Sequence, residues 1–149
     1  MKNLKFKVIN PLNHFTEMLD LLTQLNPTME VRRLEMLQKE MAQMPNYNCF
    51  GLFIDKELIG ISSGWTTVRI YCGKQLELDN VIISSTIQSK GYGKYFMKSI
   101  QEWCIQNGYE SLSLNTYVQN SRSHKFYFNE DFKILGFHFE KRISKKMTL

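Results

Sequence analysis

Apolar and polar residues follow two kinds of pattern along the chain. Alternation predicts a strand, because successive side chains of a strand point to opposite faces, and recurrence every three or four residues predicts a helix. Strand patterns cover residues 5–9, 49–54, 58–70, 75–84, 111–117 and 133–143. Helix patterns cover residues 13–25, 26–44, 92–107 and 121 to about 130. The order β-α-α-β-β-β-α-β-α-β predicts an α/β (α+β) fold, a mixed sheet with helices on its faces.

Several residues are expected to mark where these helices begin and end. Asn13 is expected to cap the first helix, and Asn26-Pro27 is expected to cap and open the second, since Asn caps helices well and Pro is favoured in the first helical position. Pro45 is expected to end the second helix, and Gly108 is expected to take the left-handed conformation that follows a helix.

Length and composition are those of one globular domain. The 149 residues are 43% apolar and 22% charged, which predicts a single packed domain over residues 1–149. No apolar run is long enough to span a membrane, and the N-terminus alternates charged and apolar residues where a signal peptide would be apolar throughout. We therefore expect a cytoplasmic protein without a membrane partner. Three scattered cysteines and three scattered histidines predict neither a disulfide framework nor a metal site.

Most of the net charge of +5 lies in a basic C-terminal tail, residues 141–149, which carries four Lys or Arg and no acid. The preceding 140 residues hold 15 basic and 14 acidic residues, so the body of the protein is nearly neutral. A nucleic-acid-binding face would spread basic residues over an element and interleave them with aromatic ones. We therefore do not expect nucleic acid as the partner, although binding through the tail is a second alternative.

The segment of residues 81–94 is the part of the sequence that points to chemistry. It leads from the apolar run Val81-Ile82-Ile83 through a polar loop with Gly91 and Gly93 into a strong helix. Unpaired N–H groups and the positive end of the helix dipole form an anion site at such a junction, and Lys90 and Lys94 add positive charge. The loop lacks the glycine spacing of a P-loop and the third glycine of a dinucleotide fingerprint.

The pattern Gln88-x-x-Gly91-x-Gly93 resembles the acetyl-CoA pyrophosphate loop of the GCN5-related N-acetyltransferase (GNAT) superfamily. Some 30 residues later, Asn120-x-x-Ser123-x-x-Phe126-Tyr127 is similar to a second segment of that family, which usually continues with Gly-Phe where this chain has Asp131-Phe132. Asp tolerates left-handed backbone, so a changed turn is expected there. The resemblance implies a mostly antiparallel sheet of six or seven strands, about four helices, and transfer of an acetyl group from acetyl-CoA to a primary amine within a ternary complex.

The resemblance also implies roles for individual residues. Glu77 would be the general base, and Asp79, two residues along the same strand face, is the alternative. Tyr127 would donate a proton to the leaving thiolate, and Asn120 would cap its helix, contact the cofactor, or both. Backbone groups of Val81, Ile82 and Ile83 would bind the pantetheine arm and the thioester oxygen. The pyrophosphate would lie against residues 88–94, which are Gln88, Ser89, Lys90, Gly91, Tyr92, Gly93 and Lys94.

The acceptor amine is not identified by these motifs. Met29, Met36, Met41 and Met44 either pack in the core or line an adaptable acceptor groove. An edge strand near the C-terminus is able to pair two subunits, so a homodimer is one expectation. The alternative to an enzyme is a non-catalytic acyl-CoA-binding module that has the same loop and no working base.

Overall fold

The computed structural model describes residues 3–87 and 90–144, so the predicted site residues Gln88 and Ser89, and much of the basic tail, lie outside the described residues. The chain forms two compact units, residues 1–114 and 115–149. The first unit contains the sheet and three of the four α-helices of the described chain, and the second contains the fourth. Each unit is described by itself below.

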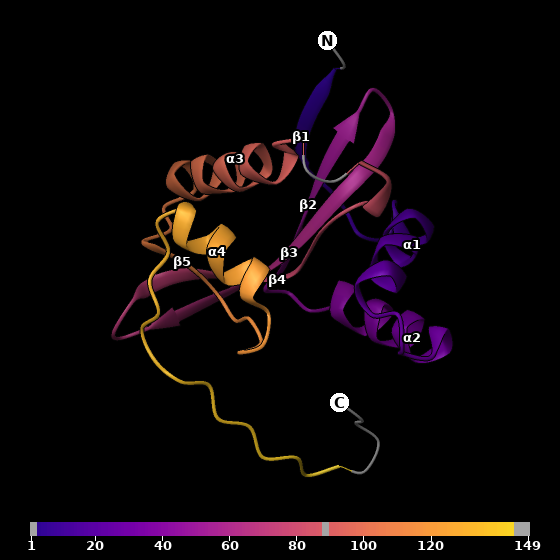
Figure 1. Ribbon diagram of the computed structural model, residues 1–149. Helices are drawn as coiled ribbons and strands as arrows, with labels where there is room; N and C mark the ends of the chain where they lie inside the picture. The colour runs from indigo at the N-terminus through magenta and orange to yellow at the C-terminus, as the bar shows by residue number, and fades with distance from the viewer. Residues whose placement is uncertain (1–2, 88–89, 145–149) are drawn as a thin grey trace. The chain divides into compact units, whose positions relative to one another are not determined.

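The first unit is built on a mixed sheet of five strands in the order β1-β2-β3-β4-β5 (Figure 1). The strands are β1 (Leu4–Val8), β2 (Tyr47–Ile54), β3 (Glu57–Arg69), β4 (Gly73–Ile83) and β5 (Ser111–Leu114). The first four pair antiparallel in sequence order, and β5 pairs parallel to β4. The mostly antiparallel mixed sheet is confirmed, whereas the expected six or seven strands are corrected to five within residues 3–87 and 90–144.

Helices cover both faces of this sheet (Figure 1). On one face, α1 (Phe15–Leu25) and α2 (Val31–Ala42) bury Met18 and Leu34 in one cluster with Cys49 and Ile61 of the sheet. On the other, α3 (Tyr92–Gln106) places the Trp103 ring 4.9 Å from that of Phe50. Since Cys49 and Phe50 are neighbours on β2, they point to opposite faces, and each face has its own helical layer.

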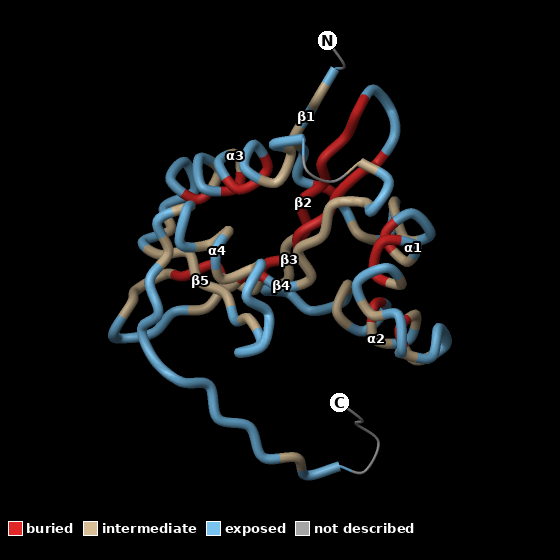
Figure 2. Tube along the Cα trace, in the orientation of Figure 1, coloured by how far each residue is buried: buried red, intermediate tan, exposed pale blue. Residues whose placement is uncertain are grey.

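The central strands are buried on both faces, and the end of β4 is not (Figure 2). Phe50, Leu52 and Ile61 of β2 and β3 are fully buried. The run Val81-Ile82-Ile83, expected to be covered on both faces, is only half-buried, which corrects that expectation. The reason is local: β5 pairs with β4 only as far as Leu78, so the last part of β4 has a strand on one side.

Two of the expected helix starts are wrong. His14 and not Asn13 precedes α1, and α2 begins at Val31 after Glu30 instead of at Pro27. Asn26 instead follows α1, where its side chain donates to the carbonyl of Leu22 at 3.0 Å. Side-chain capping and turn formation use the same Asn chemistry, so the residue type alone does not separate the two outcomes. Gly108 has the expected left-handed backbone, with φ of 75° after α3.

The second unit contains α4 (Ser121–Asn129) and the residues that follow it. Asp131 adopts a left-handed backbone with φ of 65°, as expected for the changed turn, and the N–H of Phe132 returns to the carbonyl of Tyr127 at 3.0 Å. The strand expected over residues 133–143 is absent, because the described residues 132–144 have no regular secondary structure. Alternation shows which side chains would lie on the same face of a strand. A strand forms only where a neighbouring strand provides partners for its backbone hydrogen bonds.

Candidate functional site

A β-bulge lies near the end of β4 and changes the direction of the strand. Ser63 pairs with Asp79, whereas Ile61 pairs with Ile82, so β4 contains one more residue than β3 over this stretch. Asn80 takes up the irregularity with a left-handed backbone of φ 52°. Bulges of this kind bend the strand and commonly stand beside functional sites. In this chain the bulge immediately precedes Val81-Ile82-Ile83, the residues expected to contact the acyl donor.

The sheet opens at the same place. The parallel ladder joins Gln75–Leu78 of β4 to Ser111–Leu114 of β5 and ends there, while β4 continues to Ile83. Beyond Leu78, no described strand of the first unit pairs with this side of β4.

The junction between β4 and α3 has the features of an anion site. A short 3-10 helix, Ser85–Ile87, follows β4, and Gly91 precedes α3 with a left-handed φ of 78°. The first N–H to bond within α3 is that of Tyr95, which donates to the Gly91 carbonyl at 3.1 Å. The N–H groups of residues 91–94 consequently have no acceptor within the helix and carry its positive dipole end. Lys90 and Lys94 are exposed beside them.

Glycine is required at position 91 by its backbone conformation and not by crowding. A Cβ built on Gly91 would meet no atom within 4 Å, so the space over this turn is open. A residue with a side chain is nevertheless disfavoured at a φ of 78°. This open turn at a helix N-terminus fits a diphosphate, which needs close approach to several N–H groups.

The two candidate carboxylates lie on β4 and face the layer of α1 and α2. Asp79 pairs with Ser63 and Glu77 pairs with Trp65, so both side chains share the face of Cys49. The Asp79 carboxylate accepts two hydrogen bonds. The Trp65 indole donates to Oδ2 at 3.3 Å, and the backbone N–H of Asn80 donates to Oδ1 at 2.9 Å. Glu77 is half-buried and lies two residue pairs further from the bulge than Asp79.

Sequence reasoning missed a group of neutral donors on the same face. The Tyr47 hydroxyl is hydrogen-bonded to Ser63 Oγ, and its ring lies 4.6 Å from that of Trp65. Burial, together with the neighbouring Cys49, holds the pKa of Tyr47 far above its usual value, and burial also raises the pKa of the Cys49 thiol. Both groups thus stay protonated. Alternation along β2 predicts that residues 47 and 49 share a face, but their contact with Ser63 depends on the register between strands.

In the second unit, Asn120 and Tyr127 belong to the same helix. Asn120 caps α4, because its side-chain oxygen accepts the N–H of Ser123 at 3.2 Å. The Tyr127 ring lies between Phe126 and Phe132, at 5.2 and 5.4 Å between ring centres, and burial raises the pKa of its hydroxyl. Tyr127 is therefore a protonated donor at neutral pH. His124 is engaged with the carbonyl of Tyr117 at 2.9 Å.

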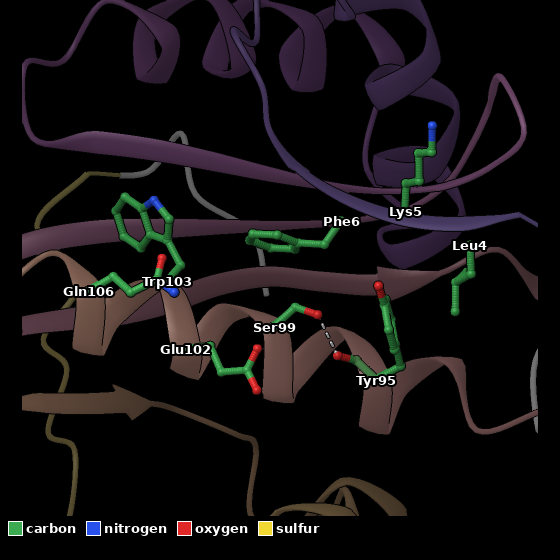
Figure 3. Close-up of a pocket in the computed structure, with 8 residues that line it drawn as sticks. All are labelled: Leu4, Lys5, Phe6, Tyr95, Ser99, Glu102, Trp103 and Gln106. Atoms are coloured by element: carbon green, nitrogen blue, oxygen red, sulfur yellow. Dashed lines mark hydrogen bonds between the residues drawn. The ribbon is translucent and has the colours of Figure 1, made fainter.

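A cavity of about 380 Å³ lies between β1 and α3, and Figure 3 shows its lining. Tyr95, Ser99 and Trp103 line it from the helix, with Phe6 and Lys5 opposite. None of the residues predicted for binding or chemistry belongs to this lining, so the cavity is separate from the bulge and the loop.

Two further properties concern residues 3–87 and 90–144 only. No helix in this part of the chain is long and apolar enough to cross a membrane. Nor do three or more His, Cys, Asp or Glu side chains gather there in an arrangement that would hold a metal ion.

The sequence and the fold of this chain are similar to those of known proteins. A model of the acetyltransferase (GNAT) family matches residues 15–132. The uncharacterized N-acetyltransferase YhdJ of Bacillus subtilis strain 168 is 27% identical over 130 residues, which cover 87% of this chain and 85% of the relative. An aminoglycoside N-acetyltransferase, AAC(6')-Iy, solved in complex with CoA, is 17% identical with a TM-score of 0.79, covering 95% of each chain. A ribosomal-protein-alanine N-acetyltransferase of Brucella melitensis is 14% identical with a TM-score of 0.80, covering 95% of this chain and all of the other.

Proposed function

Because the chain belongs to the acetyltransferase (GNAT) family, we propose that it transfers an acetyl group from acetyl-CoA to a primary amine by direct attack in a ternary complex. The observation that carries the proposal is the sequence of features along one stretch of chain. A bulged strand continues past its parallel neighbour and leads, through a left-handed glycine, to the first N–H groups of α3, which have no acceptor within the helix.

The binding of acetyl-CoA is assigned to backbone groups. The diphosphate lies against residues 88–94, where the α3 dipole, Lys90 and Lys94 favour negative charge. The pantetheine arm lies along Val81, Ile82 and Ile83, and an N–H of this run donates to the thioester oxygen as negative charge develops on it. The relative AAC(6')-Iy was solved with CoA, which supports this assignment.

Glu77 is proposed as the general base, acting directly or through one water. A lysine-like amine is only about 0.04% neutral at pH 7, which costs about 4.6 kcal/mol before attack begins. A carboxylate that accepts the proton removes much of that barrier. Asp79 is the alternative on the same strand face, and its two hydrogen bonds favour a role in holding the amine.

Tyr127 is proposed to donate a proton to the departing thiolate. Its pKa is raised by burial, so the hydroxyl carries its proton at neutral pH. Asn120 holds the start of the helix that carries Tyr127, which makes Asn120 a positioning residue. The proposed reaction needs no metal ion, because the base, the oxyanion donor and the acid are all protein groups.

Self-association is a further part of the proposal. The described residues after α4 carry exposed apolar side chains, namely Ile134, Leu135, Phe137, Phe139 and Ile143, with 74 to 97% exposure. The first unit has two strands, β1 and β5, at the edges of its sheet. We propose that residues 133–143 are covered by a second copy of the chain, forming a homodimer. The cytoplasmic location stays a prediction.

The test is turnover of acetyl-CoA with a panel of amines, measured as release of free thiol. Wild-type protein is expected to acetylate at least one amine, and Glu77→Gln and Tyr127→Phe are each expected to lower kcat by about 100-fold or more. Asp79→Asn, on the same strand face, distinguishes the two carboxylates. Binding of acetyl-CoA without turnover of any amine would instead establish a non-catalytic acyl-CoA-binding module.

A further inference from the structure

The strand β1 lies at an edge of the sheet, and its backbone groups alternate between β2 and the outer side. Among the described strands of the first unit, β1 pairs with β2 alone. Ile9 donates its N–H to β2 at 3.0 Å, and Asn3 accepts at 2.9 Å from the residue that follows β2, so the odd-numbered residues bond to β2. The N–H and carbonyl groups of Leu4, Phe6 and Val8 therefore point outward, where no described strand of this unit meets them.

The side chains of β1 divide between the two faces of the sheet. Lys5 pairs with Phe53, and the Lys7 ammonium lies 4.9 Å from the centre of the same ring, so both lysines lie on the face that α1 and α2 cover. Phe6 lies on the other face, where its ring centre is 6.1 Å from that of Phe96 of α3. Figure 3 shows Lys5 pointing away from α3 and Phe6 pointing toward it. The strand thus has a basic face and an apolar face.

The cavity of about 380 Å³ lies between the apolar face of β1 and α3 (Figure 3). Its helix wall is one face of α3, with lining residues every three or four positions, namely Tyr95, Ser99, Glu102, Trp103 and Gln106. These positions span about 16 Å of helix, enough to flank about five residues of an extended chain. Since an apolar cavity of about 150 Å³ holds one benzene molecule, this one has room for side chains. We call the outer edge of β1 and this cavity the β1–α3 groove.

The two sides of the β1–α3 groove differ in charge. Among the side chains that line its cavity, Glu102 is the one carboxylate, and it is exposed. Lys5 and Lys7 are exposed on the opposite face of β1, and neither belongs to an ion pair among residues 3–87 and 90–144. A strand added beside β1 would therefore meet a negative charge on its α3 side and two positive charges on its other side.

These charges disfavour a second copy of β1 as the added strand. Two β1 strands paired edge to edge would bring Lys5 and Lys7 of both copies onto one face, and like charges on neighbouring strands repel each other. Lysines on an edge strand commonly prevent pairing with an identical edge. A strand with acidic side chains on that face would instead be attracted.

We propose that the β1–α3 groove binds an extended segment of a partner protein, which joins the sheet as a strand beside β1. The side chains of this segment alternate. Apolar and basic ones enter the cavity toward Trp103 and Glu102, and acidic ones lie beside Lys5 and Lys7. Main-chain hydrogen bonds to β1 hold the segment, and the side chains select it. The interaction goes beyond the proposed acetyl transfer and involves no residue assigned to that reaction.

The test uses an amidated peptide, Thr-Val-Glu-Phe-Glu-Arg-Thr, with fluorescein at its N-terminus. Alternation places Val, Phe and Arg on one face and both Glu on the other. Fluorescence anisotropy during titration with the full chain, without acetyl-CoA, should show saturable micromolar binding. A peptide of the same composition without the alternation should bind at least about tenfold more weakly. No saturable binding up to about 200 µM protein, or equal affinity of the two peptides, overturns the proposal. Because no turnover is measured, the result is independent of the proposed function.

Methylation of peptide nitrogens tests whether the peptide binds as a strand. In an antiparallel pair the N–H of the peptide's Phe points to β1, and in a parallel pair the N–H groups of its two Glu do. One peptide is methylated at the Phe nitrogen and another at both Glu nitrogens. We expect one of them to lose binding and the other to keep it. Binding that both retain contradicts strand addition.

Val8→Pro tests the same contact from the side of the protein. The substitution removes an outward N–H and no bond to β2, and proline is tolerated on edge strands in this position. Val8 is 52% exposed, so Val8→Ala is the matched control, which loses the side chain and keeps the N–H. We expect about twofold to tenfold weaker peptide binding for Val8→Pro and wild-type binding for Val8→Ala. Equal affinities in two variants that fold as the wild type does contradict the proposal.

Charge reversal tests the chemistry of the partner. Glu102→Lys should weaken binding of the peptide by about twofold to fivefold, and should strengthen by a similar factor the binding of a peptide in which Glu replaces Arg. Glu40→Lys, an equal charge change at an exposed position of α2, should alter neither affinity. If Glu102→Lys changes both affinities in the same direction, Glu102 does not select the partner.

A peptide of residues 133–143 distinguishes the partner from a second copy of this chain. If this peptide binds the wild type and binds Val8→Pro more weakly, while the alternating acidic peptide does not bind, the β1–α3 groove is a self-association surface and the partner proposal is overturned. Binding of the acidic peptide that the 133–143 peptide does not displace supports the proposal.

Discussion

The indole Nε1 of Trp65 donates a hydrogen bond of 3.3 Å to Oδ2 of Asp79, across the β3–β4 ladder and next to the bulge at Asn80. The bond joins β3 to the residue of β4 that directly precedes the bulge. It orients the carboxylate of Asp79, which lines a cavity of about 120 Å³ between α1, α2 and the bulge of β4. The orientation of Asp79 is thus set by a residue 14 positions earlier in the chain.

Trp65→Phe is expected to raise KM for the acceptor amine by about threefold to tenfold, with kcat nearly unchanged, because a less ordered carboxylate holds the amine less well. Steady-state kinetics at saturating acetyl-CoA measures both constants. In an Asp79→Asn background the same substitution should add little, since the two side chains act as one unit. Val68→Ala, an exposed change on β3, is the control. Additive effects of Trp65→Phe and Asp79→Asn would show that the hydrogen bond does not serve binding.

Alkaline pH is expected to destabilise the fold through Cys104. Burial raises the pKa of this thiol from 9.0 to about 11. A raised pKa means that the folded state retains the proton while the unfolded state loses it, so the free energy of unfolding falls as pH rises from about 9 to about 11. Chemical denaturation across this range should show a loss of about 1 to 2 kcal/mol attributable to Cys104.

Cys104→Ala should reduce that pH dependence, and Cys72→Ala, at a half-buried cysteine for comparison, should not. Cys49, whose pKa is also raised by burial, adds to the slope from about pH 9 in the wild type and in both variants. Tyr47 and Tyr127, whose pKa values are raised by burial as well, add to the slope only above about pH 10. The account of Cys104 is wrong if both cysteine variants show the wild-type slope between pH 9 and pH 10.

Local patterns were sufficient to predict much of this molecule. The anion loop was predictable because Gly91 precedes a strong helix and Gly93 lies in the first turn of that helix, and Gly91 has the left-handed backbone that such a turn requires. The strand over residues 133–143 was wrong, since alternation shows which side chains share a face and not whether a neighbouring strand is present. Tyr47 and Ser63 were missed because their contact depends on the register between strands, at a separation of 16 residues.

Removing apolar surface after α4 is expected to weaken self-association. Phe137 and Phe139 are 88 and 91% exposed, so the double variant Phe137→Ser and Phe139→Ser removes a large part of the proposed contact without removing packing within the unit. Light scattering after size-exclusion chromatography should give a dimer mass for the wild type and a monomer mass for the variant. His138→Ser, between the two, should remain dimeric. A monomeric wild type at all concentrations up to about 100 µM would refute the homodimer, given that stable interfaces reach micromolar affinity or better.

The central claim is that the N-terminus of α3 binds the diphosphate of coenzyme A, and two glycines of nearly equal backbone geometry test it. Gly91 precedes α3 and Gly108 follows it, with φ of 78° and 75°, and a Cβ at either position meets nothing within 4 Å. Alanine should therefore cost each variant a similar stability, about 1 to 2 kcal/mol. Isothermal titration of CoA into the wild type, Gly91→Ala and Gly108→Ala is the measurement. We predict binding to the wild type and Gly108→Ala with similar affinity, and at least about tenfold weaker binding to Gly91→Ala. No heat of binding in the wild type, or equal affinity of the two variants, would contradict the account.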